Sequence, residues 1–197
     1  MHIPKAFEIK DHELAFELIQ ENAFGQLISS IDGRPFSTHV PFLVSDDHAY
    51  LHGHLGIKNP QLSELEGKEV LAVFSGEHDY VSPSWYRSPG VPTWNYQAVH
   101  VYGRCKLMHD KSALRALVDG LTRKYESTMR APWQPEYNPM MLKAIVGFEI
   151  EITDVQCQFK LSQNRSTEDR LAVIEQLKQS GQVKLAAAMQ AELERGS

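Results

Sequence analysis

The sequence predicts a mainly β fold with attached helices, an α+β protein built around a small antiparallel barrel. Short β-like runs recur through the first 160 residues, and an Asp-Gly dipeptide separates two of them as in a tight hairpin. Helical periodicity is confined to segments before, between and after these runs. Many short strands with helices attached in this way are typical of a small barrel with helical decorations.

The composition indicates an ordinary globular protein with one main domain. Of the 197 residues, 42% are hydrophobic and 23% are charged, close to the averages of about 45–50% and about 25% for soluble domains. The net charge of −5 and the lack of any Lys/Arg-rich run disfavour a surface that neutralises nucleic-acid phosphates. Cys105 and Cys157 lie far apart without a CxxC pair, which favours two reduced thiols over a metal knuckle.

The expected location is cytoplasmic, without membrane contact. The first residues, MHIPKAFEIKDHE, carry charges and a proline where a signal peptide has its apolar region. No stretch of the chain approaches the roughly 18 consecutive apolar residues of a membrane span.

The N-terminal half reads as one helix followed by strands. Asp11 can cap a helix through about Glu21. The runs FGQLISSI and RPFSTHVPFLV flank Asp32-Gly33, the dipeptide best suited to the positive φ angles of a type I′ turn. Further strands are expected at 49–55 and 70–75, joined by a loop that leads into a short helix.

The C-terminal half continues the strands at 80–81, 98–108 and 146–159. Asp110 begins a helix whose apolar residues follow helical spacing, namely Leu114, Leu117, Val118, Leu121 and Tyr125. The segment 132–139, PWQPEYNP, contains three prolines and is expected to be a surface loop.

Two helices are expected to close the chain. Ser166 with Asp169 resembles a capping box, Gly181 ends the first helix, and the second runs over about 183–194. Apolar positions on the first of these helices are Leu171, Val173, Ile174 and Leu177. We therefore divide the chain into a barrel domain of residues 1–165 and a helical extension of residues 166–197.

Histidines gather on the predicted barrel. His52 and His54 share one face of a strand, about 6.6 Å apart, and His39 and His100 could join them. Three interpretations are open: a metal site, hydrogen bonding on a polar barrel face, and contact with a cofactor. An HxH pair alone falls short of the three or four ligands of a zinc site, so we predict no metal and favour cofactor contact.

A planar phosphorylated cofactor needs aromatic walls, neutral hydrogen-bonding groups, and cations or amides at its phosphate. Lys58-Asn59 precedes a likely helix start and could hold a phosphate, although a solvated lysine is the alternative. Trp94-Asn95 places a ring beside an amide. KLSQNR at 160–165 suits either a helix-capping loop or an anion-binding segment.

Seven segments carry, in order, a resemblance to a known family: MHIPKAF, NAFGQLIS, THVPFLV, LHGHLGIKNPQ, SPSWY, VPTWNYQAVHVYG and KLSQNR. The chain resembles the FMN-binding, PaiB-like family of negative transcriptional regulators. The resemblance implies an FMN-binding split β-barrel with a C-terminal helical extension, similar to pyridoxamine-phosphate oxidase and flavin reductase domains. It further implies a homodimer with FMN at the subunit interface.

The resemblance also assigns the cofactor-binding residues, and it leaves the catalytic residues unknown. Four residues would lie along the flavin ring: Thr38, His39, Val40 and Pro41. His52, Gly53 and His54 would lie beside the ribityl chain and phosphate, with Lys58 and Asn59 at the phosphate. Trp94 and Asn95 would close the ring side.

The activity is open to three interpretations. The first is an FMN-binding regulator with flavin-dependent oxidoreductase chemistry. The second is a haem-binding or haem-degrading split barrel, since a histidine could be an axial ligand. The third is a direct DNA-binding repressor, which the acidic Glu175, Glu192 and Glu194 of the last helices disfavour. The substrate, electron donor and operator are not indicated by the sequence.

Overall fold

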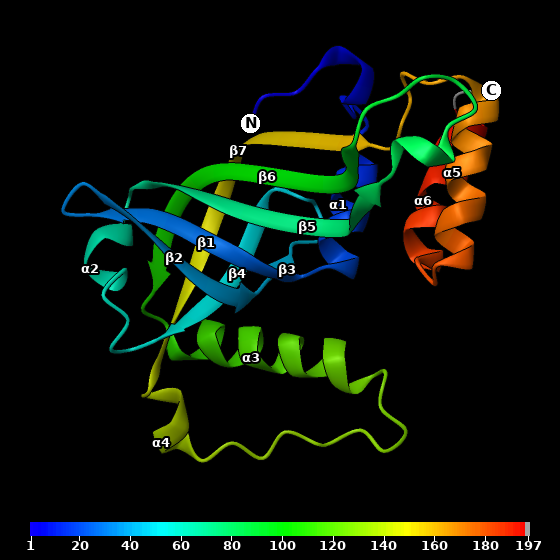
Figure 1. The fold of residues 1–197 in the computed structure, drawn as a ribbon. Helices are drawn as coiled ribbons and strands as arrows, with labels where there is room; N and C mark the ends of the chain where they lie inside the picture. Colours follow the sequence, from blue (N-terminus) through cyan, green and yellow to red (C-terminus); the bar gives the residue numbers. More distant parts are fainter. Residues whose placement is uncertain (196–197) are drawn as a thin grey trace. The chain divides into compact units, whose positions relative to one another are not determined.

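The computed structural model describes residues 1–195 and contains one seven-stranded sheet with six α-helices in that range (Figure 1). The strands are β1 (Phe24–Ile31), β2 (Arg34–Pro41), β3 (Leu43–Val44), β4 (Tyr50–Gly56), β5 (Glu69–Val81), β6 (Thr93–Met108) and β7 (Ile145–Lys160). The helices are α1 (His12–Glu21), α2 (Leu62–Leu65), α3 (Lys111–Glu126), α4 (Pro139–Leu142), α5 (Thr167–Gln179) and α6 (Val183–Arg195). Two 3₁₀ turns are η1 (Lys5–Phe7) and η2 (Pro83–Trp85).

The sheet order explains why the strands form a barrel. The order is β2-β1-β5-β6-β7-β4-β3, and the pairs β1–β2, β1–β5, β3–β4 and β4–β7 are antiparallel. Although β2 is at one edge of this order, it also lies against β4, near the other edge. The sheet therefore curls back toward itself, and the predicted α+β barrel class is confirmed.

The β1–β2 hairpin forms as its turn residues require. Asp32 and Gly33 have φ values of 50° and 76°, and Ile31 pairs with Arg34 across the turn. Two successive positive φ values define the predicted type I′ geometry. The second arm ends at Pro41, earlier than expected, although fully buried Phe42 still donates its N–H to the carbonyl of Ala23 at 2.8 Å in the register of the hairpin.

Two strand predictions were too short. The runs expected at 70–75 and 80–81 are one strand, β5, and β6 begins at Thr93 instead of 98. The polar segment 75–79 interrupts the apolar pattern; the alternation of burial continues to Gly76, which is buried, and is lost at His78, which is exposed. A glycine at an inward position gives no hydrophobic signal, so the sequence pattern underestimated the strand.

One compact unit comprises residues 16–74 and 100–155. Its core contains Phe42 packed edge-to-face against Phe74 and Phe148. The Asp110 carboxylate caps α3 by accepting the N–H of Ala113. Three leucines of α3, Leu114, Leu117 and Leu121, form a buried cluster. Partly buried apolar side chains of the same unit pack against it, namely Leu43, Met108, Val118 and Ile145.

Details of the α3 region differ from the prediction. Tyr125, expected on the apolar face of α3, is 41% exposed. The last proline of the predicted loop, Pro139, opens the short helix α4, where Asn138 provides the cap. Proline suits the first turn of a helix because its missing N–H would lack an intrahelical partner there.

The other compact unit comprises residues 1–15, 75–99 and 156–197, of which residues up to 195 are described. Helices α5 and α6 pack side by side in it (Figure 1), burying Leu177, Leu185 and Met189. Leu171 was wrongly placed on the apolar face and is 46% exposed, whereas Asp169 and Arg170 are buried. The domain boundary at residue 165 stays a prediction.

Candidate functional site

The loop after β4 is tied to the β1–β2 hairpin by one buried glutamine. Gln61 is fully buried, and its amide donates to the carbonyl of Leu27 at 3.2 Å and to Ser29 Oγ at 2.9 Å. The Thr38 hydroxyl donates to Gln61 Oε1, and Asn59 Nδ2 donates to Thr38 Oγ1 at 3.0 Å. The structure thus brings together Thr38 of β2 and Asn59 of the loop, two residues of the predicted site.

The remaining β2 residues of the predicted site point to two faces. Val40 is buried, whereas His39 is exposed and stacks on Phe24 with ring centroids 6.0 Å apart. Pro41 is half-buried at the strand end, and Lys58 is exposed. His39 and Lys58 are therefore accessible to a ligand, whereas the Val40 side chain lies in the interior.

The two histidines of β4 share a face, as predicted, and differ in their partners. His52 Nε2 lies 3.1 Å from Glu149 Oε2 on β7. His54 Nδ1 is buried without a partner among the described residues, and burial lowers the pKa of this imidazole. A buried polar atom without a partner is costly in an otherwise satisfied structure, so His54 Nδ1 is suited to a hydrogen bond with a ligand.

Gly53 and His100 complete the predicted group in this unit. A Cβ on Gly53 would lie 2.4 Å from Phe148 Cζ, so only glycine allows β4 to approach this ring. His100 on β6 also has a buried Nδ1 without a partner among residues 1–195, and burial lowers its pKa. Both His54 and His100 are therefore neutral near pH 7, when they can donate or accept a hydrogen bond.

Trp94 and Asn95 belong to the other compact unit and face opposite sides of β6. Trp94 is 54% exposed and meets Tyr80 edge-to-face at 6.2 Å. Asn95 is fully buried, and its Nδ2 donates to Ser162 Oγ at 3.0 Å and to Met189 Sδ at 3.3 Å. A ligand on the exposed side of β6 would contact the Trp94 ring but not the Asn95 amide.

The KLSQNR segment forms hydrogen bonds both within its own turn and to distant residues. Lys160 Nζ donates to Thr93 Oγ1 and to the carbonyl of Trp94. Gln163 bonds back to its own turn, accepting from Leu161 N and donating to the carbonyl of Phe159. Ser166 caps α5 by accepting the N–H of Asp169. The cap of α5 therefore comes from Ser166, directly after the segment, and the anion-binding interpretation stays a prediction.

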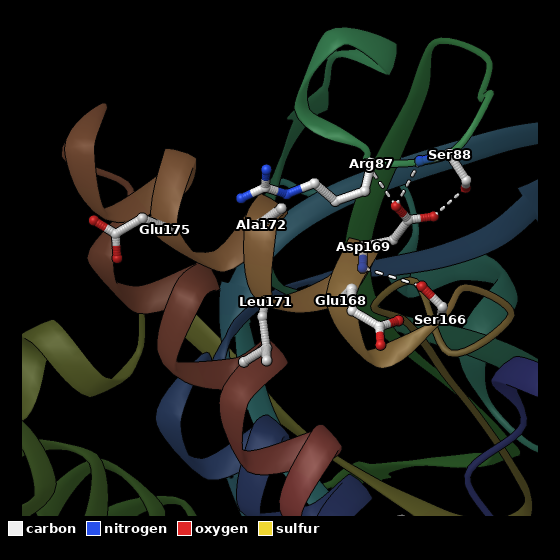
Figure 2. Close-up of a pocket in the computed structure, with 8 residues that line it drawn as sticks. All are labelled: Arg87, Ser88, Ser166, Glu168, Asp169, Leu171, Ala172 and Glu175. Atoms are coloured by element: carbon white, nitrogen blue, oxygen red, sulfur yellow. Dashed lines mark hydrogen bonds between the residues drawn. The ribbon is translucent and has the colours of Figure 1, made fainter.

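Asp169 shapes a shallow groove of about 690 Å³ at the start of α5. Figure 2 shows its carboxylate directed at the loop after η2, where it accepts from Arg87 N at 2.6 Å, Ser88 N at 3.1 Å and Ser88 Oγ. These bonds, led by that of the Ser88 hydroxyl, lower the pKa of Asp169. The expected capping box is therefore incomplete, because this carboxylate holds the loop instead of the N-cap backbone.

Gln61 and Asp169 organise the structure in ways that the sequence patterns did not predict. Gln61 directly follows Asn59-Pro60 at the end of LHGHLGIKNPQ, and its place in that motif is the one signal for it in the sequence. The sequence predicts Asp169 only as a capping residue. Within residues 1–195 the structure has no group of three or more His, Cys, Asp or Glu side chains arranged to hold a metal, and none of the described helices could cross a membrane.

The fold is that of the flavin-binding split β-barrel proteins. It matches an FAD- and haem-binding protein from Mycobacterium smegmatis with a TM-score of 0.66 and 16% identity, covering 84% of this chain and 78% of that one. It matches the flavocytochrome Anf3 from Azotobacter vinelandii with a TM-score of 0.64 and 17% identity, covering 87% and 78%. At these identities the likeness establishes the fold alone.

The sequence places the chain within one family of this class. Residues 1–154 match the family described as "Putative FMN-binding domain", and the chain belongs to it. It is also 42% identical over 185 residues to "Protease synthase and sporulation protein PAI 2" of Bacillus subtilis (strain 168), covering 90% of this chain and 89% of the relative. The predicted PaiB-like resemblance, the split-barrel class and FMN as the cofactor are confirmed.

Proposed function

We propose that this protein binds FMN through β2, β4 and the loop after β4, within a homodimer in the cytoplasm. The observations that carry the proposal are the Thr38–Asn59–Gln61 network and the buried His54 Nδ1, which has no partner among the described residues, in a member of an FMN-binding family. The network fixes the loop that presents Lys58. FMN, when bound, supplies a ring that accepts and releases electrons.

The residues of this unit have different parts in the proposed site. The Lys58 ammonium and Asn59 suit the phosphate, because a mobile cation and an amide can bind its oxygens. His54, held neutral by burial, suits a hydrogen bond to an uncharged part of the cofactor. Gly53 contributes its backbone, since Phe148 occupies the space of a side chain.

Other residues of the predicted site enlarge the proposed contact surface. His39 stays accessible beside Phe24, and His52 is oriented by Glu149. Val40 and Pro41 form the apolar part. In the other compact unit, Trp94 has an exposed ring, and Asn95 supports its strand through Ser162.

The dimer is supported by aromatic side chains left exposed. Phe24 is 67% exposed and Trp94 is 54% exposed, and large apolar side chains at a surface are typical of contact sites. A cytoplasmic location agrees with Cys105 and Cys157, which are free thiols in the folded protein. Sedimentation equilibrium should give twice the chain mass, and a monomer at micromolar concentration would contradict the dimer.

The experiment that tests FMN binding is an absorbance spectrum of freshly purified protein, followed by titration of the apoprotein with FMN. We expect bound flavin absorbance, and we expect Lys58→Ala and Asn59→Ala to weaken FMN binding about tenfold, the effect of losing one charge-assisted hydrogen bond. Lys68→Ala, at another exposed lysine of this unit, is the matched control. Colourless protein that fails to bind added FMN would overturn the proposal.

Haem is the second candidate, because the neutral imidazole of His54 or His100 suits an axial ligand. The same spectrum separates the two: a Soret band after haem addition that is lost in His54→Ala or His100→Ala favours haem. Competition by FMN for that site would count against it.

We further propose that any regulatory role is indirect. The net charge of −5 opposes tight contact with DNA phosphates. A gel-shift series across salt concentrations tests this point. Specific binding with a steep salt dependence would show direct DNA contact and contradict the proposal.

A further inference from the structure

A small pocket lies within the unit formed by residues 1–15, 75–99 and 156–195. Its volume is about 140 Å³, comparable to a cavity of about 150 Å³ that holds benzene. Two cations, two rings and a rim of mixed polarity line it, namely Lys160, Arg165, Phe7, Tyr86, Val91 and Asn164. These residues come from four of the segments that marked the sequence, and none belongs to the FMN contacts proposed on β2 and β4.

The cations of this pocket lack anionic partners. Lys160 is half-buried, and its two recorded acceptors, Thr93 Oγ1 and the carbonyl of Trp94, are both neutral. Burial lowers the pKa of this ammonium. Among the described residues neither Lys160 nor Arg165 forms an ion pair within 4.0 Å. Since a lysine is rarely buried unless paired, the Lys160 ammonium would gain from an anion.

Arg165 is held against the Tyr86 ring at the pocket wall. Its guanidinium lies 4.3 Å from the centroid of the Tyr86 ring, and Nη1 donates to the carbonyl of Pro89 at 3.0 Å. Asp169 acts on Arg165 electrostatically, but the carboxylate is occupied by Arg87 and Ser88. The outer edge of the guanidinium therefore keeps donors for a planar anion.

Two hydrogen-bonded side chains line the pocket on its buried side. Asn95 and Ser162 bond to each other there, and Ser162 has a φ of 66°, a conformation that non-glycine residues seldom adopt. Gly90 lets the covering loop approach, because a Cβ there would lie 2.3 Å from Tyr86 Cδ2. Backbone strain and close packing of this kind are typical of preformed ligand sites.

We propose that this pocket is a second ligand site, separate from the FMN contacts, that binds a small organic carboxylate. The carboxylate group would bind Lys160 and Arg165, and a flat apolar body of about six ring atoms would lie against Phe7 and Tyr86. The pocket volume excludes a ligand as large as FMN. The proposal goes beyond FMN binding and does not depend on it.

The test is isothermal titration of the full chain with benzoate, with benzamide as the neutral match of the same shape. We expect benzoate to bind at least tenfold more tightly than benzamide, and inorganic phosphate to compete. Lys160→Gln and Arg165→Lys should each weaken benzoate at least tenfold, the second because lysine lacks the guanidinium fork. Lys184→Gln, at a 79% exposed lysine of the same unit, should change nothing.

Each alternative outcome decides the matter. Equal binding of benzoate and benzamide, or no benzoate binding, overturns the proposal. If Lys160→Gln melts at a lower temperature than wild type, Arg165→Lys and the wild-type comparison of the two ligands still decide it. Flavin absorbance is read in parallel to distinguish the two sites. If Lys160→Gln loses FMN binding and FMN displaces benzoate, the pocket is part of the cofactor site, and the proposal of a separate ligand site is overturned.

Discussion

At the residue scale, buried polar side chains fix the loops around the candidate sites. Gln61, Asn95 and Asp169 are each almost fully buried and each joins segments distant in sequence. Such residues cannot be distinguished from surface polar residues by composition or periodicity, because the signal lies in their distant partners. The sequence therefore identified Thr38 and Asn59 through motifs but not Gln61, which holds them together.

Gln61→Ala should lower both stability and FMN affinity. The change removes the acceptor of the Thr38 hydroxyl and the side-chain donor to Ser29 Oγ and to the carbonyl of Leu27, and the loss of such buried hydrogen bonds costs about 1–3 kcal/mol of unfolding free energy. Urea unfolding measures this loss, and FMN titration measures the effect on the loop. Gln20→Ala, at an exposed position of α1, should stay within about 0.5 kcal/mol of wild type. An unchanged Gln61→Ala would show that water replaces the network.

Asp169 should make stability depend on acid pH. Its pKa is lowered in the folded protein, first by the hydrogen bond from the Ser88 hydroxyl, so the unfolded chain binds the proton more readily. The stabilisation is fully present above the unfolded value of about 3.9 and is lost as pH falls through the lower folded value. Asp169→Asn should therefore melt below wild type at pH 7, with the difference shrinking below about pH 4. A pH-independent difference would contradict this role.

At the element scale, the sequence predicted the features whose signals are local. The β1–β2 hairpin, α3 and α5 follow from Asp32-Gly33, Asp110 and Ser166 because each turn or cap depends on neighbouring residues. The lengths of β5 and β6 depend instead on pairing across the sheet. Polar positions within those strands are stabilised by distant partners, so a local pattern could not predict them.

Two glycines of β4 should respond differently to substitution by alanine, because only one of them lies against a side chain of β7. Gly53→Ala forces a Cβ to within 2.4 Å of Phe148 Cζ, and such overpacking costs about 1–3 kcal/mol. Gly56→Ala meets no atom within 4 Å and should be neutral or slightly stabilising, because alanine restricts the unfolded chain. Chemical denaturation of both variants checks the contrast. Equal stabilities would mean that Phe148 moves aside freely.

At the scale of the whole molecule, the motifs indicated the ligand but not the distribution of residues between the two compact units. Most residues predicted to bind FMN lie in the segment 16–74 of one unit, whereas Trp94 and Asn95 lie in the other unit. Sequence order could not show that Trp94 and Asn95 face opposite sides of β6, because the strand was expected to begin after them. Once β6 is known to start at Thr93, strand alternation separates them directly.

The two cysteines should report whether the compact units unfold together. Cys105 and Cys157 lie in different units, and burial raises the pKa of each thiol to about 12, with the Glu66 charge adding to the effect at Cys105. At pH 8 only about one folded thiol in ten thousand is a thiolate, against roughly a quarter at the unfolded pKa of about 8.5. In the variants Cys105→Ser and Cys157→Ser, the single remaining thiol should therefore react with a disulfide reagent only when unfolding exposes it.

The labelling midpoints in urea should coincide for the two single-thiol variants. Strands β5, β6 and β7 each run through both units, so loss of the strands in one unit removes pairing in the other, and unfolding should be cooperative. Circular dichroism must confirm that each serine variant folds and must give the same midpoint as labelling. Reaction of Cys157 at a lower urea concentration than Cys105 would show that the unit containing α5 and α6 opens first.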